Sequence, residues 1–126
     1  MENLTFERQG LKRSELEIKN FKNIAKAAID SKVGNILICK NRDNIVLGAT
    51  LFLEDTKAAY YFAGANHPEY RKSGCGTFLL IESIRKCYDK NLKKIDMVGI
   101  NSPNRGLFKV SLNALPTPYF EVDLSI

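Results

Sequence analysis

The sequence has few of the residues that build disulfide frameworks and metal sites. Its 126 residues include only 3 cysteines and 1 histidine. Cys39, Cys75 and Cys87 are odd in number and widely spaced, and no C-x-x-C motif occurs. Neither a disulfide framework nor a zinc site is therefore indicated. We expect a chain that binds no metal and keeps its thiols reduced, as in the cytoplasm.

Long hydrophobic runs and low-complexity tracts are also missing. The first ten residues, MENLTFERQG, contain no apolar signal region. No segment approaches the roughly 18 consecutive apolar residues of a membrane span. The 4 prolines and 8 glycines form no linker, and no repeat is present. These absences predict a cytoplasmic protein without membrane contact, folded as a single domain over residues 1–126.

What the chain does contain is a core and a modest positive charge. Hydrophobic residues make up 44% of the sequence, which supplies a core at this length without disulfides. The net charge is +5, from 19 Lys and Arg against 14 Asp and Glu. This excess suits an anionic ligand. Binding of nucleic acid is weakly indicated, because basic and aromatic residues are not interleaved.

A helix is predicted near the N-terminus, and three strands after it. Ser14 and Glu17 form an S-x-x-E capping box, and apolar residues then recur at helical spacing. We expect a helix over 15–31, ended by Gly34. The runs NILICK, IVLGATLFL and AAYYFAGA are then separated by the turns NRDN and EDTK, which predicts antiparallel strands.

The second half of the chain predicts a mixed sheet. The apolar stripe over Thr77–Lys90 indicates a helix, IDMVGI a strand, and NSPNRGLFKVSLNAL a loop with a short helix. PTPYFEVDLS is predicted to close the sheet as an edge strand. We expect Ala58–Gly64 and Ile95–Ile100 to run parallel, joined by the helix between them. The predicted class is α/β or α+β, with a mostly antiparallel sheet and flanking helices.

The loop HPEYRKSGCG, residues 67–76, carries the clearest chemical signal. It joins a predicted strand to the N-terminus of a helix, where backbone N–H groups lack partners and the dipole is positive. Gly74 and Gly76 allow close approach of a ligand, and Arg71 and Lys72 add charge. The loop predicts a phosphate or pyrophosphate cradle. The alternative is a plain strand-to-helix turn with a solvated basic rim.

R-K-S-G-C-G resembles the Q/R-x-x-G-x-G/A signature of the GNAT acyltransferases, and the order of the predicted elements resembles theirs. The resemblance implies acetyl-CoA or another acyl-CoA as co-substrate and transfer of the acyl group to a small-molecule amine by direct attack. The expected cofactor-binding residues are Asn66, Arg71, Lys72, Ser73, Gly74, Cys75, Gly76, Thr77 and Asn101. Asn101 has an alternative interpretation as an Asx turn before Pro103.

The stretch DMVGINSPNRGLFKVSLNALPTPYF resembles, more narrowly, the C-terminal half of the FemAB/BioF2-like branch of GNATs. This branch implies an amino sugar or a cell-envelope precursor as acceptor, or aminoacyl-tRNA as donor. In the last case the CoA cradle would be vestigial, and tRNA would be the nucleic-acid partner.

The chain departs from the GNAT pattern in two places. The first strand and helix of the family should precede the helix over 15–31, so the domain is expected to be N-terminally truncated and completed by a second copy or a partner domain. The position of the usual general-acid tyrosine holds Phe108, which cannot donate a proton. A degenerate module that binds a nucleotide or a partner without turnover is therefore the rival hypothesis.

Tyr119 and Lys109 are the expected catalytic residues. Tyr119 would replace the missing acid, and Lys109 would stabilise charge at the acyl-transfer centre, although packing and a solvated face are the alternatives. His67 is a candidate general base or a loop residue. Cys75 lies at a helix N-terminus, which lowers the pKa of a thiol, but the family transfers directly, which favours a bystander. Glu54 and Asp55 either orient an amine or form a turn.

Overall fold

The computed structural model describes residues 14–99 and 103–125. The chain divides into two compact units, Met1–Asp96 and Met97–Ile126. The prediction of a truncated N-terminus concerns residues 1–13 and lies outside the described residues.

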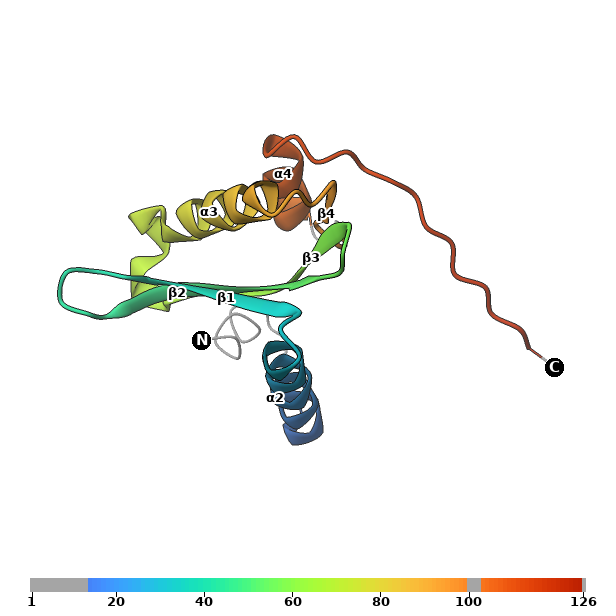
Figure 1. The fold of residues 1–126 in the computed structure, drawn as a ribbon, viewed down its shortest axis with the longest axis horizontal. Coiled ribbons are helices and arrows are strands. Elements are labelled where there is room, and N and C mark those ends of the chain that lie inside the picture. Colours follow the sequence, from blue (N-terminus) through green and yellow to red (C-terminus); the bar gives the residue numbers. More distant parts are fainter. Residues whose placement is uncertain (1–13, 100–102, 126) are drawn as a thin grey trace. The chain divides into compact units, whose positions relative to one another are not determined.

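The first unit is built on a four-stranded sheet in the order β1-β2-β3-β4 (Figure 1). Its strands are β1 (Gly34–Lys40), β2 (Val46–Glu54), β3 (Ala58–Asn66) and β4 (Lys94–Asp96). Neighbours β1 and β2 pair antiparallel, as do β2 and β3, whereas β3 and β4 run parallel. The predicted mixed, mostly antiparallel sheet is confirmed, including its parallel pair.

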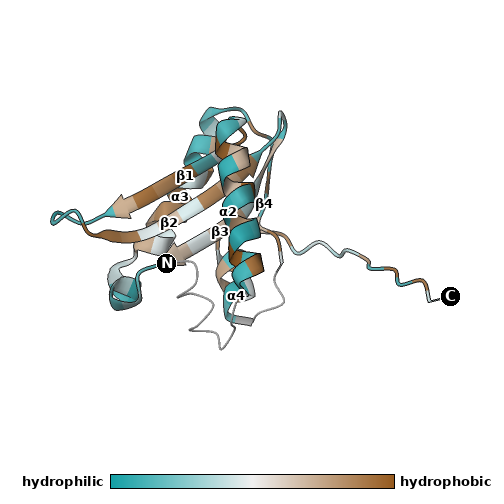
Figure 2. Cartoon of the chain, turned by 90° about the horizontal axis from the view of Figure 1, so that it is seen from below, coloured by the Kyte–Doolittle hydropathy of each residue, from teal (hydrophilic) through white to brown (hydrophobic). Residues whose placement is uncertain are grey.

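Helices lie on opposite faces of this sheet (Figures 1 and 2). Helix α2 (Glu15–Asp30) contacts β1, and α3 (Cys75–Asp89) packs on β1, β2 and β3. Because α3 also connects β3 to β4, it is the predicted crossover between the parallel strands.

The start of α2 follows the sequence, but its end does not. The Ser14 hydroxyl accepts from the Glu17 amide and the Glu17 carboxylate accepts from the Ser14 amide, both at 3.1 Å, so the capping box is confirmed. The helix ends at Asp30 rather than at Gly34. Gly34 instead begins β1, where a Cβ atom would stand 2.9 Å from the Ala28 Cβ. Its lack of a side chain lets the strand pass close to the helix.

Helix α3 is fixed to β2 near its middle and at its C-terminus. Ser83 donates to the Leu79 carbonyl at 2.8 Å, and its hydroxyl lies 3.0 Å from the Thr50 hydroxyl in a buried pair. At the end of the helix the Lys90 ammonium contacts both Glu54 carboxylate oxygens at 3.1 Å. These contacts hold the register of the helix over the sheet and so fix where its N-terminus lies.

Strand β4 is shorter than the predicted strand over 95–100. It pairs with β3 only from Ala58↔Lys94 to Tyr60↔Asp96. Residues 97–99 are not in a strand, and Val98 has a φ of 56°. A β-branched residue at positive φ is incompatible with extended backbone, so the strand stops before it. Ile100 lies outside the described residues.

In the second unit the predicted short helix is confirmed as α4 (Pro103–Ser111). The predicted edge strand PTPYFEVDLS is wrong, because none of the described residues after α4 is in a strand. Phe120 and Val122 are 88% and 83% exposed. A strand requires a ladder partner, and Pro116 and Pro118 have no N–H to donate. The alternating hydrophobicity of this segment suggested a strand, but it does not specify a neighbouring strand with which to pair.

Apolar side chains remain exposed at the start of the sheet. Ile36 and Ile38 of β1 are 44% and 55% exposed, and Figure 2 shows hydrophobic residues, in brown, along β1. Apolar surface at this place was expected from the sequence, and a partner that covers it stays a prediction. In the described part of the chain, none of the helices has the length and hydropathy needed to span a bilayer.

Candidate functional site

The candidate site lies where β3 passes through a tight turn into α3. After Asn66 the chain forms a 3-10 helix over Pro68–Ser73, and α3 begins at Cys75. Gly74 separates the two helices with a φ of 80°. An L-residue side chain is disfavoured in this left-handed conformation, so the glycine is required for the sharp change of direction.

His67 begins the turn, and its backbone amide and its imidazole both take part in hydrogen bonds there. Its amide donates to the Leu47 carbonyl at 2.7 Å, and its Nδ1 accepts from the Glu69 amide at 3.2 Å. The imidazole also packs edge-on against Tyr70, with ring centroids 5.1 Å apart. Because Nδ1 already accepts a hydrogen bond, His67 acts as a cap of the 3-10 turn, as the loop-residue interpretation predicts.

The first turn of α3 presents backbone donors. The Cys75 amide donates to the Ser73 hydroxyl at 3.2 Å, and the first helical bond runs from the Phe78 amide to the Gly74 carbonyl at 3.0 Å. The intervening amides of Gly76 and Thr77 have no intrahelical acceptor. Within the described ranges no other acceptor meets them. An anion can bind these N–H groups at the positive end of the helix dipole.

Two positively charged residues precede these donors in the chain. Arg71 and Lys72, on the last turn of the 3-10 helix, are both exposed, as are Ser73, Gly74 and Thr77. The guanidinium and ammonium groups can therefore reach a bound anion through solvent without any burial cost. The structure brings together every predicted cofactor-binding residue of the loop.

The two loop glycines have different surroundings. A Cβ on Gly74 would meet nothing within 4 Å. A Cβ on Gly76 would stand 2.8 Å from Nδ2 and 3.0 Å from Oδ1 of Asn66. The same Oδ1 also approaches Gly48, whose Cβ would lie 2.9 Å from it. Asn66 thus fills a space that exists only because both neighbours are glycines.

Cys75 does not have the activated thiol that a helix N-terminus can produce. The side chain is only 5% exposed. Burial, followed by a hydrogen bond with Cys39, raises the pKa of Cys75 to about 12. The expected lowering is wrong, because desolvation of the thiolate outweighs the helix dipole. The thiol is therefore protonated at neutral pH. Only the backbone of Cys75 belongs to the candidate anion site.

The edge of β3 beside the loop is open. Its pairing with β4 stops at Tyr60, although the strand continues to Asn66. In the same region β3 carries an irregularity, since the register with β2 shifts between Leu51 and Phe52. Among the described residues no strand pairs with this edge beyond Tyr60. Its backbone groups can bind an extended ligand as a strand would.

Glu54 and Asp55 form a turn and an ion pair rather than an amine site. Asp55 accepts from the amides of Lys57 and Ala58, both at 2.7 Å. These backbone hydrogen bonds lower the pKa of Asp55 below its usual value. Glu54 is paired with Lys90. The turn interpretation of these acids therefore fits the structure.

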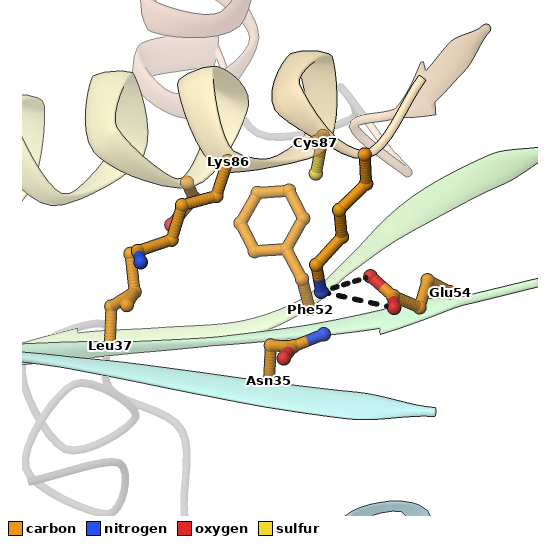
Figure 3. A pocket seen from close by; sticks show the side chains of 8 residues that line it. Asn35, Leu37, Phe52, Glu54, Lys86 and Cys87 are labelled. Atoms are coloured by element: carbon orange, nitrogen blue, oxygen red, sulfur yellow. Dashed lines mark hydrogen bonds and ion pairs between the residues drawn. The ribbon is translucent and has the colours of Figure 1, made fainter. Parts of the chain in front are cut away.

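A small cavity lies at the other end of α3 (Figure 3). Its volume is about 20 Å³, enough for roughly one water molecule. Phe52, Cys87 and the Glu54–Lys90 pair line it, between the sheet and the last turns of the helix. It is too small for a cofactor, and it belongs to the packing of α3 on β2.

The expected catalytic residues Lys109 and Tyr119 belong to the second unit, whereas the loop belongs to the first. The Lys109 ammonium donates to the Gly99 carbonyl at 2.7 Å, and the residue is only 7% exposed. Tyr119 is 66% exposed, and Phe108 is 38% exposed. Asn101 falls outside the described residues.

The close approach of Cys39 and Gly48 to Cys75 was not predicted from the sequence. Cys39 and Gly48 face each other across β1 and β2, and a Cβ on Gly48 would also stand 2.8 Å from the Cys75 sulfur. The signal was present in IVLGATLFL, because a glycine inside an otherwise apolar strand often marks close approach of another group.

Comparisons with known proteins agree with this architecture. The profile of a family described as "Acetyltransferase (GNAT) domain" matches residues 5–107. A possible acetyltransferase from Clostridium difficile 630 superposes with a TM-score of 0.75 at 16% identity, covering 99% of this chain and 86% of its own. No curated protein sequence matches the chain.

Two aminoglycoside acetyltransferases share the fold. The aminoglycoside 6'-N-acetyltransferase from Acinetobacter haemolyticus superposes with a TM-score of 0.66 at 13% identity, covering 90% of this chain and 86% of its own. The aminoglycoside N-acetyltransferase AAC(6')-Iy, solved in complex with CoA, gives 0.61 at 10% identity, covering 90% of this chain and 96% of its own.

Proposed function

This chain belongs to the GNAT acetyltransferase family, and we propose that it transfers an acetyl group from acetyl-CoA to a primary amine. The observation that carries the proposal is that the edge of β3 left unpaired beyond Tyr60 ends at Asn66, whose side chain lies against Gly76 at the start of α3. An extended thiol arm can lie along the strand edge while a pyrophosphate meets the helix N-terminus.

The phosphate end is supported by the donors and charges of the loop. The amides of Gly76 and Thr77 would bind the pyrophosphate oxygens directly, and Arg71 and Lys72 would add attraction through solvent. The Ser73 hydroxyl keeps the Cys75 amide occupied, and so helps to shape the turn. No metal is needed for this contact, because backbone amides and the helix dipole supply the positive potential.

At the other end, backbone groups near Asn66 would polarise the thioester carbonyl. The amine nitrogen then attacks the carbonyl carbon directly, a C–N bond forms and the C–S bond breaks. The proton lost by the amine ends on the leaving thiolate, directly or through an acid. Phe108 cannot serve as that acid, so Tyr119 is proposed for this role. Lys109 is proposed to act at the same end by stabilising charge and by holding Gly99.

The acceptor is proposed to be a small amine such as an amino sugar. The two aminoglycoside acetyltransferases of the same fold act on compounds of this class. The FemAB/BioF2-like resemblance of the C-terminal segment points in the same direction, through cell-envelope precursors that carry amino sugars. We propose a cytoplasmic location because acetyl-CoA is supplied in that compartment.

The test begins with calorimetric titrations of CoA, dephospho-CoA and pantetheine. We expect CoA to bind, and pantetheine to bind at least tenfold more weakly because it lacks the pyrophosphate. A screen of amines against acetyl-CoA, with detection of the released thiol, then identifies the acceptor.

Each of the other possible results of these titrations would favour a different function. Equal affinity for CoA and pantetheine would show that the loop does not bind phosphate. CoA binding without thiol release from any amine would favour the degenerate module, in agreement with Phe108. Absence of CoA binding together with salt-dependent tRNA binding would favour an aminoacyl-tRNA-dependent enzyme.

A further inference from the structure

Two of the three free cysteines meet beneath the loop. Cys39 is half-buried in β1, and Cys75 is the buried first residue of α3. The Cys39 thiol is one of the groups that raise the pKa of the Cys75 thiol, so the two side chains lie close together. Cys87, the third free thiol, lies near the other end of α3, beside the small cavity of Figure 3.

Gly48 makes this meeting possible. It is the partner of Cys39 in the β1–β2 ladder, so side chains at the two positions would stand on one face of the sheet. Facing Cβ atoms in such a pair are typically about 4.5–5.5 Å apart. The Cys75 sulfur lies 2.8 Å from where a Gly48 Cβ would be. It therefore occupies the place of the missing side chain, directly beside Cys39.

We propose that Cys39 and Cys75 form an oxidation site, at which a peroxide converts the two thiols into a disulfide between β1 and the first residue of α3. Cys39 is the more exposed of the two and meets the oxidant first. The Cys75 sulfur already lies where a side chain on Gly48, the ladder partner of Cys39, would stand, so the fold itself brings the two thiols close together.

The steps balance with hydrogen peroxide as the only co-reactant. The Cys39 sulfur attacks one peroxide oxygen, the O–O bond breaks, and sulfenic acid and water form. The Cys75 sulfur then attacks the Cys39 sulfur, the S–O bond breaks, and the hydroxide leaves as water with the Cys75 proton. Both thiols are oxidised by one electron each, and the peroxide is reduced to two water molecules.

The disulfide is expected to weaken pyrophosphate binding, a consequence that rests on the proposed function. A disulfide requires sulfur atoms about 2.05 Å apart, much closer than two thiols that are not bonded to each other. Closing that gap moves Cys75 toward β1 while Thr50 and Ser83 still hold the middle of α3. The adjacent amides of Gly76 and Thr77 then no longer converge as they do in the reduced protein.

The cysteines are readily distinguished by peptide mapping. Trypsin places Cys39 in VGNILICK, Cys75 in SGCGTFLLIESIR and Cys87 in CYDK. Reduced protein is treated with hydrogen peroxide, alkylated, digested and analysed without reductant. We expect the first two peptides to be linked, and reductant to restore both. Cys87→Ser serves as the matched control that keeps the link, and Cys39→Ser as the variant that loses it, with circular dichroism to verify folding.

A link between other cysteines, a link only between chains, or no link after stoichiometric peroxide would overturn the proposal. CoA titration of the oxidised protein is expected to give at least a tenfold higher Kd, reversed by reductant. An unchanged Kd with the disulfide present would overturn the proposed effect on binding. If the disulfide forms and CoA binds neither state, the function fails while the oxidation site stands.

Discussion

The Asn66 side chain lies against the backbone of Gly76, 2.8 Å from where a Cβ atom of that residue would be. The last residue of β3 thereby touches the first turn of α3, next to the donors proposed for pyrophosphate. This contact explains the second glycine of the loop by a protein neighbour, whereas the first glycine is explained by its positive φ.

Substitution of the two glycines should separate these causes. Gly76→Ala should lower stability by about 1–3 kcal/mol, because the methyl group overlaps the Asn66 amide. Gly74→Ala should cost about 1–2 kcal/mol through its left-handed backbone, with no steric overlap. Urea unfolding measures both. The double variant Asn66→Ala, Gly76→Ala should recover part of the loss, whereas Asn66→Ala should not rescue Gly74→Ala. Strict additivity in the first pair would contradict the contact.

Arg71→Ala should weaken CoA binding by about 1–2 kcal/mol, the scale of a charge-assisted hydrogen bond. The loss should shrink as salt increases, since the side chain is exposed. Arg42→Ala, in the exposed turn between β1 and β2, is the matched control for net charge and should change affinity far less. Calorimetry at low and high salt decides the matter, and equal losses in the two variants would point to net charge alone.

Cys75 should be the least reactive toward iodoacetamide at neutral pH. With a pKa of about 12, its thiolate fraction at pH 8 is roughly a thousandfold below that of an ordinary thiol. We expect Cys39 to be alkylated at least tenfold faster than Cys75. The reaction is run between pH 7 and 9, and mass spectrometry measures the extent of alkylation at each cysteine. Cys87, whose pKa burial also raises, should be slow too. Comparable rates at Cys39 and Cys75 would contradict the buried environment.

The raised pKa of Cys75 also predicts that the stability of the protein depends on pH. The folded state holds the Cys75 proton more tightly than the unfolded state, whose thiol has an ordinary pKa. The contribution is therefore complete below about pH 8.5 and is lost as pH rises toward 12. Cys75→Ala should flatten the decline of the urea midpoint above pH 9, and Cys39→Ala should change it less. An unchanged slope in Cys75→Ala would show that other groups cause the decline.

Tyr119→Phe should lower kcat while leaving CoA affinity intact, because the hydroxyl would act only at the reacting end. Lys109→Met should lower kcat and also destabilise the protein, since the ammonium is buried on the Gly99 carbonyl. Lys109→Arg keeps the charge and separates the two effects. If neither kcat falls more than about twofold, the proposed roles of these residues are wrong, although the loop proposal survives.

Local signals in the sequence were sufficient for most of the first unit. The capping box at Ser14, the hairpin turn of β1 and β2, and the stripe of α3 are each encoded within a few neighbouring residues, and each is confirmed. The loop could be found for the same reason, because strand, glycines and helix are contiguous. The parallel pairing of β3 and β4 followed from the handedness and order of their connection.

Features that depend on distant neighbours could not be predicted. The end of β4 depends on the positive φ of Val98, which no local pattern indicates. The unpaired segment around Phe120 has the alternation of a strand, but alternation does not specify a partner. The thiol pair of Cys39 and Cys75 requires the register of β1 against β2 and a glycine between them.

The short pairing of β3 with β4 also predicts an order of folding. Strands β1, β2 and β3 form a meander whose contacts are local in sequence, so they can form early. Strand β4 must wait for α3 to be made and docked, and then contributes only three residue pairs. Pulse-labelling hydrogen exchange should therefore protect amides of the meander before that of Ile95. On the ribosome, the N-terminus of α3 would emerge onto a meander that is already complete.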